Sequence, residues 1–216
     1  ILSSGGFTYE IEETVRLQIP AFYIAQKSRV WLKGRNGTGK STLFKMLVKD
    51  ALYERGCLFI NNQDIHDIEN IDAYIFYSPQ NTKVWFNDRT LYENITYGIV
   101  SDNNDIENYI QHWLHMFQLG RLLLHMKYDN LSGGELQKLI MIRSSLMPHP
   151  IILLDEPTSD WSPESQHAFF HTHVHTMFKD KTLLIILHSE EEHFSGCFDQ
   201  VLHFDIPLTV EQTTRR

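Results

Sequence analysis

The feature that most constrains this chain is a glycine-rich loop, Gly34–Ser41, with the sequence GRNGTGKS. It fits the pattern GxxxxGK[ST], follows a short apolar segment typical of a buried strand, Arg29–Leu32, and precedes apolar residues at helical spacing. Glycines let backbone N–H groups wrap around phosphates, and the N-terminus of the following helix adds free donors and a favourable dipole. Lys40 can then reach the β- and γ-phosphates, and the hydroxyl of Ser41 can bind Mg²⁺. The loop therefore predicts a nucleotide phosphate site in an α/β protein.

A second motif places two carboxylates directly after a buried strand. The apolar segment Ile151–Leu154 is followed by Asp155 and Glu156. The carboxyl end of a strand is where an open α/β sheet presents its ligand site. There Asp155 suits coordination of Mg²⁺ beside Ser41, and Glu156 suits polarising an attacking water. Alone, the pair could equally be a solvated turn, but the phosphate loop upstream favours the chemical interpretation.

Strands and helical segments alternate along most of the chain. Strands are predicted at 7–11, 14–19, 22–25, 29–32, 57–60, 73–77, 151–154, 182–187 and 201–205, and helices over about 91–126 with a polar break at 101–105, 136–147 and 164–178. This pattern predicts an α/β fold: a P-loop NTPase core with a mainly parallel sheet and an antiparallel β-part near the N-terminus. The segment of about 82–145 interrupts the alternation, so we expect a helical subdomain there, within a single domain of residues 1–216.

Composition narrows the classes of protein. A formal net charge of −8 and a pI near 5.8 argue against a general nucleic-acid binder, and no nucleic-acid partner is expected. The longest apolar runs are too short to cross a bilayer, so membrane contact is expected only through a partner or a missing segment. Because the chain begins at Ile1, we interpret it as an excised piece of something longer. Cys57 and Cys197 lack CxxC spacing and are interpreted as reduced thiols, although the sequence leaves a disulfide between them open.

A third motif, Leu131–Glu135 with the sequence LSGGE, narrows the family. With GRNGTGKST before it and LLDEPTSD after it, the chain resembles the nucleotide-binding domain of ATP-binding cassette (ABC) proteins over nearly its whole length. The resemblance implies that ATP binds between two such domains, where the phosphate loop of one faces the LSGG segment of the other. The nucleotide contacts that it implies are Gly34, Arg35, Asn36, Gly37, Thr38, Gly39, Lys40, Ser41 and Thr42 and, from the opposite subunit, Ser132, Gly133, Gly134 and Glu135.

Three further residues match functional positions of the family. Gln80, in the sequence YSPQ, matches a glutamine that contacts Mg²⁺ or the attacking water, and His188 matches a histidine that contacts the γ-phosphate. Tyr9, in the sequence FTY, matches an aromatic residue that stacks on adenine. The alternatives are an ordinary loop glutamine, one of twelve histidines, and a tyrosine on a strand face. The resemblance thus implies a catalytic set of Lys40, Gln80, Glu156 and His188, and Mg²⁺ contacts at Ser41, Gln80 and Asp155.

The segment Phe86–Gly98 looks like a stretch typical of exporter cassettes, which faces the membrane domains in that family. The resemblance therefore implies the motor domain of an ABC exporter at the cytoplasmic face of a membrane. ATP and Mg²⁺ would be its cofactors, and the transmembrane domains and a second nucleotide-binding domain its partners. The alternative from another class is a soluble, non-transport ABC ATPase that acts on nucleic acid or another protein. A third possibility is a cassette that binds ATP mainly as a structural switch, against which Glu156 argues.

Four departures from the family pattern stand out. The family usually has Ser-Ala-Leu-Asp after the acidic strand, whereas this chain has Ser159-Asp160-Trp161-Ser162, which places Ser162 where an aspartate normally touches the opposite subunit. Lys138 stands where arginine is usual, which loses the fork geometry but keeps the charge. An acidic segment before LSGG is not recognisable in Leu123–Asn130, and the helical subdomain looks short. We expect altered communication between the two ATP sites.

Histidines gather on one predicted helix. His167, His171 and His175 recur every four residues, with His173 between them. This spacing could form a metal-binding face, but a solvated helix face is the preferred interpretation.

Overall fold

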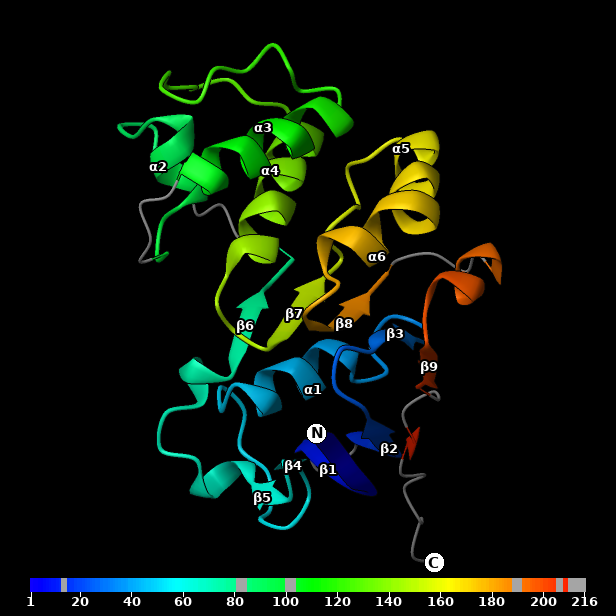
Figure 1. Cartoon of the computed structure of the whole chain (residues 1–216). Helices are drawn as coiled ribbons and strands as arrows, with labels where there is room; N and C mark the ends of the chain where they lie inside the picture. Colours follow the sequence, from blue (N-terminus) through cyan, green and yellow to red (C-terminus); the bar gives the residue numbers. More distant parts are fainter. Residues whose placement is uncertain (13–14, 81–84, 100–103, 188–191, 205–207, 210–216) are drawn as a thin grey trace, which may run out of the picture. The chain divides into compact units, whose positions relative to one another are not determined.

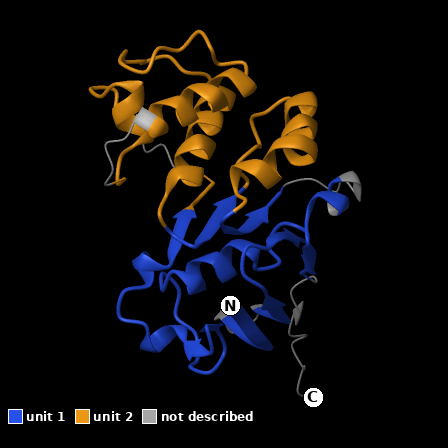
Figure 2. Cartoon of the chain, viewed as in Figure 1, with its two compact units in different colours: residues 1–77, 149–155, 180–216 blue, residues 78–148, 156–179 orange. Residues whose placement is uncertain are grey.

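The computed structural model describes residues 1–12, 15–80, 85–99, 104–187, 192–204 and 208–209 of the 216. The chain forms two compact units, coloured separately in Figure 2. The first contains Ile1–Tyr77, His149–Asp155 and Asp180–Arg216, and the second contains Ser78–Pro148 and Glu156–Lys179. The second unit is helical but extends beyond the predicted 82–145, because the chain returns to it after Asp155. The single-domain assignment of 1–216 stays a prediction.

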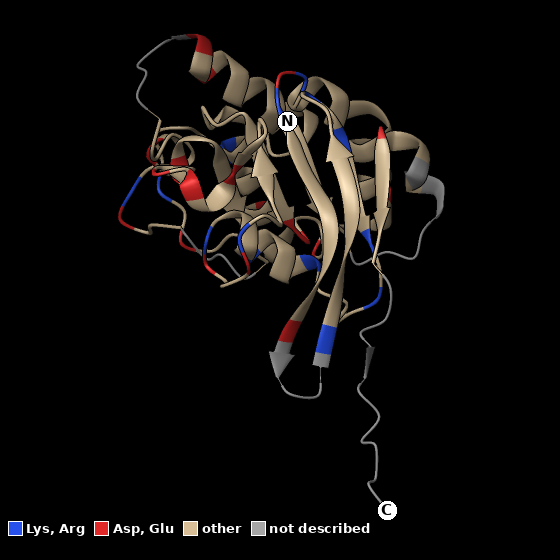
Figure 3. Ribbon diagram, turned by 90° about the horizontal axis from the view of Figure 1, so that it is seen from below, with Lys and Arg blue, Asp and Glu red and all other residues tan. Residues whose placement is uncertain are grey.

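The first sheet of unit 1 is antiparallel and is dominated by β1 (Leu2–Glu12) and β2 (Val15–Ile24). These strands form a long ribbon whose acidic and basic segments lie side by side near its tip (Figure 3), where Arg16 and Glu10 pair at 2.7 Å. The strand order is β10-β2-β1-β4-β5, with β4 at Phe59–Ile60, β5 at Gln63–Asp64 and β10 at Leu208–Thr209.

The prediction of two strands at 14–19 and 22–25 is wrong, because β2 runs through both. Pro20 has no N–H to donate, and the residue opposite, Gly6, has a φ of +80°. A Cβ at Gly6 would lie 2.9 Å from the backbone nitrogen of Ala21. Glycine therefore lets the two strands stay paired on both sides of the proline.

The second sheet of unit 1 has the order β6-β7-β8-β3-β9 (Figure 1). Its strands are β3 (Arg29–Lys33), β6 (Ile75–Ser78), β7 (Ile151–Asp155), β8 (Thr182–Ile186) and β9 (Gln200–His203). The pairs β3–β8, β3–β9 and β7–β8 are parallel, which confirms the predicted mainly parallel core. Since the carboxyl ends of parallel strands share one edge, the residues after β3 and those at the end of β7 reach the same edge of the sheet.

Helix α1 (Lys40–Leu47) lies in the core that joins the two sheets. Its side chains Leu43, Phe44, Met46 and Leu47 are fully buried, together with residues of β1, β2, β3, β7 and β8. The helix is thus held on several sides, which fixes the position of its first turn and of the loop before it. Short 3₁₀ helices, η1 (Ile65–Asp67), η2 (Ile71–Ala73) and η4 (Glu192–Cys197), complete this unit.

Apart from Ser78, the last residue of β6, the regular elements described in unit 2 are helices. They are α2 (Leu91–Ile95), α3 (Asn104–Met116), α4 (Gly133–Leu146), α5 (Pro163–Ala168), a π-helical turn η3 (Phe169–His173) and α6 (Val174–Met177). The predicted helix to residue 126 is wrong at its end, because α3 stops at Met116 and Gln118 adopts a φ of +60°. No helix in the described part of the chain is both long and apolar enough to cross a membrane.

Candidate functional site

The glycine-rich loop connects β3 to α1 and has the backbone that its sequence predicts. Gly37 and Gly39 have φ values of +79° and +99°, a region that L side chains rarely adopt. Gly34 is needed for space instead, because a Cβ there would lie 2.7 Å from the carbonyl oxygen of Phe204. Thr38 closes the loop by donating its hydroxyl to the carbonyl oxygen of Arg35 at 2.8 Å. The loop therefore leads its backbone N–H groups into the N-terminus of a buried helix, a geometry suited to phosphate.

The side chain of Lys40 folds back across this loop. Its ammonium donates to the carbonyl oxygens of Gly34 at 2.7 Å and Arg35 at 2.8 Å, and the residue is 6% exposed. A buried ammonium is costly unless it is solvated by acceptors, and the loop itself supplies them. Anionic oxygens are stronger partners for an ammonium than neutral carbonyls are. Lys40 is thus a charged donor placed at the loop, ready to exchange its partners for phosphate oxygens.

Asp155 and Ser41 meet at the carboxyl edge of the parallel sheet. Asp155 ends β7, is 6% exposed, and has the Ser41 side chain near enough to lower its pKa. Burial raises the pKa of Asp155, while the hydrogen bonds from Ser41 and Tyr77 and the charges of Lys40 and Lys45 oppose that rise. A hydroxyl and a carboxylate that lie near each other fit Mg²⁺, which prefers oxygen ligands and would favour the ionised carboxyl.

Tyr77 is a neighbour of Asp155 that the sequence did not single out. Its hydroxyl donates to Oδ2 of Asp155 at 3.4 Å. Burial, together with the charge of Asp155, raises the pKa of the Tyr77 phenol, so it remains a neutral donor at physiological pH. The only sequence signal for this contact was the position of Tyr77 at the end of a predicted strand, three residues before Gln80.

In unit 2, Glu156 and Gln80 form a hydrogen-bonded pair. Nε2 of Gln80 donates to Oε2 of Glu156 at 2.5 Å, so two residues 76 positions apart in sequence come together. Glu156 is half-buried and has a φ of +49°, a left-handed conformation that is unfavourable for a side chain of this size. Strain of this kind is common at functional sites. The direction of the carboxylate is thus fixed by both its backbone and its amide partner.

Tyr9 lines a groove of about 670 Å³ on unit 1. The groove is shared by β1 residues and the segment after α1, and its other lining residues include Phe7, Tyr53 and Cys57. Tyr9 pairs with Leu17 across the ribbon, and Leu17 packs against the phosphate loop, where a Cβ at Gly39 would lie 3.0 Å from it. The ribbon therefore brings Tyr9 to the neighbourhood of the loop, which suits a flat ring bound beyond the phosphates.

The LSGGE segment forms the start of α4. Ser132 is the N-cap, and its hydroxyl accepts from the N–H of Glu135 at 3.3 Å. In return, Oε2 of Glu135 accepts from the N–H and the hydroxyl of Ser132, both at 2.9 Å. Arg121 forms an ion pair with the same carboxylate, a partner that the sequence analysis missed. Backbone and side-chain hydrogen bonds from Ser132 and the charge of Arg121 lower the pKa of Glu135 against the opposing effect of burial.

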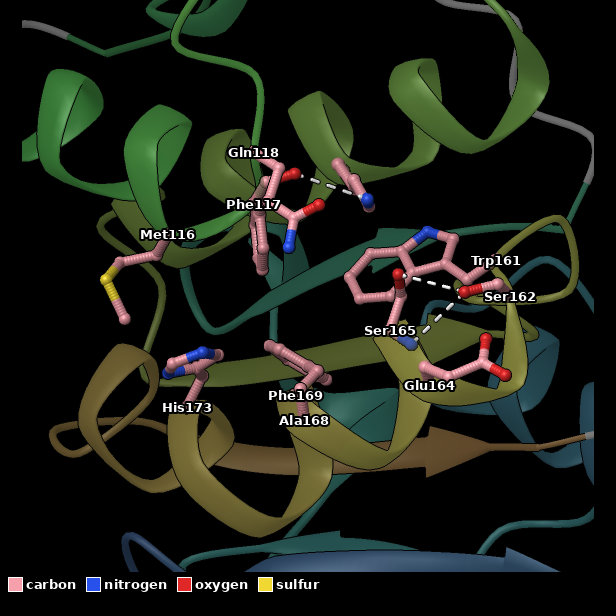
Figure 4. A pocket seen from close by; sticks show the side chains of 11 residues that line it. Met116, Phe117, Gln118, Trp161, Ser162, Glu164, Ser165, Ala168, Phe169 and His173 are labelled. Atoms are coloured by element: carbon pink, nitrogen blue, oxygen red, sulfur yellow. Dashed lines mark hydrogen bonds between the residues drawn. The ribbon is translucent and has the colours of Figure 1, made fainter.

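The segment 159–162, where the chain departs from the family pattern, is packed in unit 2. Trp161 is 6% exposed, and its ring lies 5.3 Å from Phe117 and 5.4 Å from Phe169 between centroids. Beside it is a pocket of about 370 Å³, drawn in Figure 4, which Lys138 and Ser162 also line. Ser162 is the N-cap of α5, and its hydroxyl accepts from the N–H of Ser165 at 3.3 Å.

The remaining predicted residues lie partly outside the described chain. Asn36 lies on the loop and Thr42 in α1, whereas His188 lies outside the described residues, two positions after the last residue of β8. The rings of His167 and His171 are 4.1 Å apart, but among the described residues no three His, Cys, Asp or Glu side chains could hold a metal ion. The thiols of Cys57 and Cys197 are not joined in a disulfide.

Residues 17–159 match the family model described as ABC transporter. An ATP-dependent lipid A-core flippase of Vibrio parahaemolyticus is 30% identical over 193 residues, which are 85% of this chain and 33% of the flippase. An uncharacterised ABC transporter ATP-binding protein of Methanocaldococcus jannaschii is 34% identical over 177 residues, which are 77% of this chain and 67% of that protein.

Among solved structures, a bacterial Atm1-family ABC exporter with ATP bound is similar, with a TM-score of 0.76 and 22% identity. The match covers 94% of this chain and 36% of the exporter, and at this identity it shows the fold alone. The chain spans about a third of the length of the flippases that it matches.

Proposed function

This chain belongs to the ABC transporter family of ATP-binding proteins, and from that premise we propose that it is the ATP-hydrolysing motor domain of an exporter. The observation that carries the proposal is the meeting of Ser41 and Asp155 beside a phosphate loop whose lysine is already in place. The exporter assignment is supported by the flippase relatives and by the segment Phe86–Gly98. The site of action is the cytoplasmic face of a membrane.

Each residue has a defined part in hydrolysis. The ammonium of Lys40 exchanges the carbonyl oxygens of Gly34 and Arg35 for the β- and γ-phosphates, and so stabilises charge that develops there. Glu156 accepts the proton of the attacking water. The side-chain amide of Gln80 keeps the Glu156 carboxylate in its orientation. The oxygens of Ser41, Asp155 and Gln80 are assigned to Mg²⁺, which would neutralise phosphate charge when bound. Tyr9 is assigned to adenine, and His188 to the γ-phosphate.

Phosphate release from ATP tests the catalytic assignment. Parent protein should hydrolyse ATP, Lys40→Ala should bind it weakly and not turn it over, and Glu156→Gln should bind it but turn it over at least about a hundredfold more slowly. Glu164→Gln, an exposed glutamate in α5, is the charge-matched control and should hydrolyse normally. Near-normal turnover of Lys40→Ala or Glu156→Gln would refute the assignment of that residue.

The partner in the ATP site is proposed to be a second cassette, whose Ser132 faces the γ-phosphate. Glu156→Gln should therefore be a monomer without nucleotide and a dimer with ATP, because unhydrolysed ATP bridges the two chains. Adding Ser132→Arg should return the monomer, since a bulky cation fills the phosphate position. Size-exclusion chromatography with light scattering distinguishes these states, and an ATP-dependent dimer that survives Ser132→Arg would refute the arrangement in trans.

Transport requires membrane domains. In native cells, an antibody against the chain should detect it in the membrane fraction, after a high-salt wash that removes loosely bound proteins. Recovery in the soluble fraction alone would reject the exporter in favour of a non-transport ATPase.

A further inference from the structure

Asp160 lies against the segment that is proposed to meet the γ-phosphate of a second chain. It stands where the resembled family usually carries alanine, and it has no part in the proposed hydrolysis. Gly133, Gly134 and Gln137, which it approaches, belong to unit 2 as it does. A role for Asp160 rests on the proposed function, because it concerns how tightly two chains associate around the ATP that they would share.

The backbone of Asp160 is fixed from two directions. Gln137 of α4 accepts from the N–H of Asp160 at 3.0 Å and donates to the hydroxyl of Ser159 at 2.8 Å. On the other side, Trp161 is buried and packs against Phe117 and Phe169, which lie on the same side of its ring in Figure 4. With an anchor on each neighbour, the backbone of Asp160 is held in place.

That position lies against the two glycines of the LSGGE segment. A Cβ on Gly133 would collide with Oδ2 of Asp160 and lie 3.1 Å from its Cγ, and a Cβ on Gly134 would lie 2.8 Å from its carbonyl oxygen. Neither glycine has a positive φ, so the backbone conformation alone does not demand glycine at either place. The local steric reason for both glycines is the approach of Asp160.

Two carboxylates therefore surround the N-terminus of α4. Glu135 takes the N–H and the hydroxyl of Ser132 and is neutralised in part by Arg121. Asp160 is exposed and forms no ion pair among those that the described residues show. A helix N-terminus attracts anions, and here a carboxylate of the chain itself already lies beside it.

The geometry points to Asp160 as an internal competitor of the γ-phosphate, a residue that weakens the ATP-bridged dimer of this chain. A phosphate brought to Ser132 by a second chain would face the Asp160 carboxylate at short range. Covering this surface with a partner removes the water that screens the two like charges, so their repulsion rises when the dimer closes. The Asp160 carboxylate therefore shortens the lifetime of the closed, ATP-bridged dimer.

The test compares dimer dissociation constants in saturating ATP by analytical ultracentrifugation, in the Glu156→Gln background. Asp160→Asn keeps the shape of the side chain and removes its charge, and it should tighten the dimer about tenfold at low salt. The gain should shrink as salt is raised. Glu164→Gln removes one negative charge from the first turn of α5 in the same unit, and it should leave the constant unchanged. ATP affinity of the monomer should be the same in all of these variants.

A dimer that is equally tight with Asp160→Asn overturns the inference, and so does the absence of a dimer in both proteins. A weaker dimer also overturns it, because the carboxylate would then contribute a favourable contact. Asp160→Ala serves as a second variant, and it should tighten the dimer as Asp160→Asn does. The proposed function falls separately, if Lys40→Ala leaves ATP binding by the monomer unchanged.

Discussion

At the scale of residues, the consecutive carboxylates Asp155 and Glu156 differ sharply in environment. Asp155 ends a strand inside the core, and its ionisation costs free energy there, since burial raises its pKa. Glu156 begins a turn, is more exposed, and has a left-handed backbone that changes the direction of its side chain relative to a regular strand. The difference between the two positions suits a division of labour, in which one carboxylate binds a cation and the other activates water.

The backbone strain at Glu156 predicts that relieving it raises the stability of the fold, whereas losing the side chain abolishes activity. Glu156→Gly removes the Cβ that makes a φ of +49° unfavourable, so we expect the free energy of unfolding to rise by about 1 kcal/mol. Phosphate release should be lost. Urea unfolding measures the gain, with Glu156→Gln as control, since it keeps the Cβ and should not be stabilised. Equal stability of the two variants would show that this backbone is not strained.

Burial of Asp155 predicts a dependence of stability on pH. Because its pKa is raised in the folded chain, the folded state binds that proton more tightly than the unfolded state does. Ionisation therefore costs stability at pH values above the raised pKa, and the cost disappears below the ordinary pKa of an aspartate. Asp155→Asn should raise Tm at pH 7 and lose this advantage toward pH 3.5, as measured by thermal unfolding. A variant with lower Tm at pH 7 would mean that the carboxylate stabilises the fold through Ser41 and Lys40.

At the scale of elements, both proposed phosphate contacts lie at helix starts, but they are built differently. The start of α1 has glycine in a left-handed conformation and no side-chain cap, which leaves its N–H groups for a ligand. The start of α4 is closed by a capping box between Ser132 and Glu135. The first helix is held by the core around it, whereas the second depends on its cap.

The capping box predicts the cost of changing Ser132. Ser132→Ala should lower the free energy of unfolding by about 1 kcal/mol, and Ser132→Gly by only a few tenths, because glycine is tolerated at an N-cap. Urea unfolding at fixed pH measures both. Equal losses for alanine and glycine would show that the hydroxyl does not cap α4. The comparison separates the structural part of Ser132 from its proposed contact with ATP.

At the scale of the whole molecule, each unit has its own packed interior. Unit 1 buries α1 between its two sheets, and unit 2 packs Trp113, Phe117, Trp161 and Phe169 among its helices. The phosphate loop and Asp155 belong to unit 1, whereas Gln80, Glu156 and the LSGGE segment belong to unit 2. Nucleotide that binds to the loop should therefore stabilise unit 1 first.

Linkage between binding and folding makes this measurable. At a concentration of Mg-ATP about a hundred times its dissociation constant, the free energy of unfolding should rise by about 2.7 kcal/mol. Thermal unfolding of Glu156→Gln, which limits turnover during the scan, should show the rise, and Lys40→Ala in the same background should not. A similar shift in both proteins would place the nucleotide away from the loop.

The sequence determined the parts whose signals are local. The phosphate loop and the buried strand before Asp155 each depend on residues within a few positions of one another, and both form as predicted. The alternation of apolar strands and helices predicted the α/β class for the same reason. Local signals failed to predict where elements end. Strand β2 continues through Pro20 because Gly6 is the residue opposite, and α3 ends earlier than predicted, with Gln118 in a left-handed conformation after it.

Only the tertiary structure decided which distant residues meet. Tyr77 reaches Asp155, Arg121 pairs with Glu135, and Asp160 covers Gly133, although no periodicity or spacing links these positions. Such contacts depend on how strands order in a sheet and how side chains fill space between helices, which the chain settles through packing rather than local preference. The sequence therefore identified the chemistry of the phosphate site, whereas packing set the charges and partners that surround it.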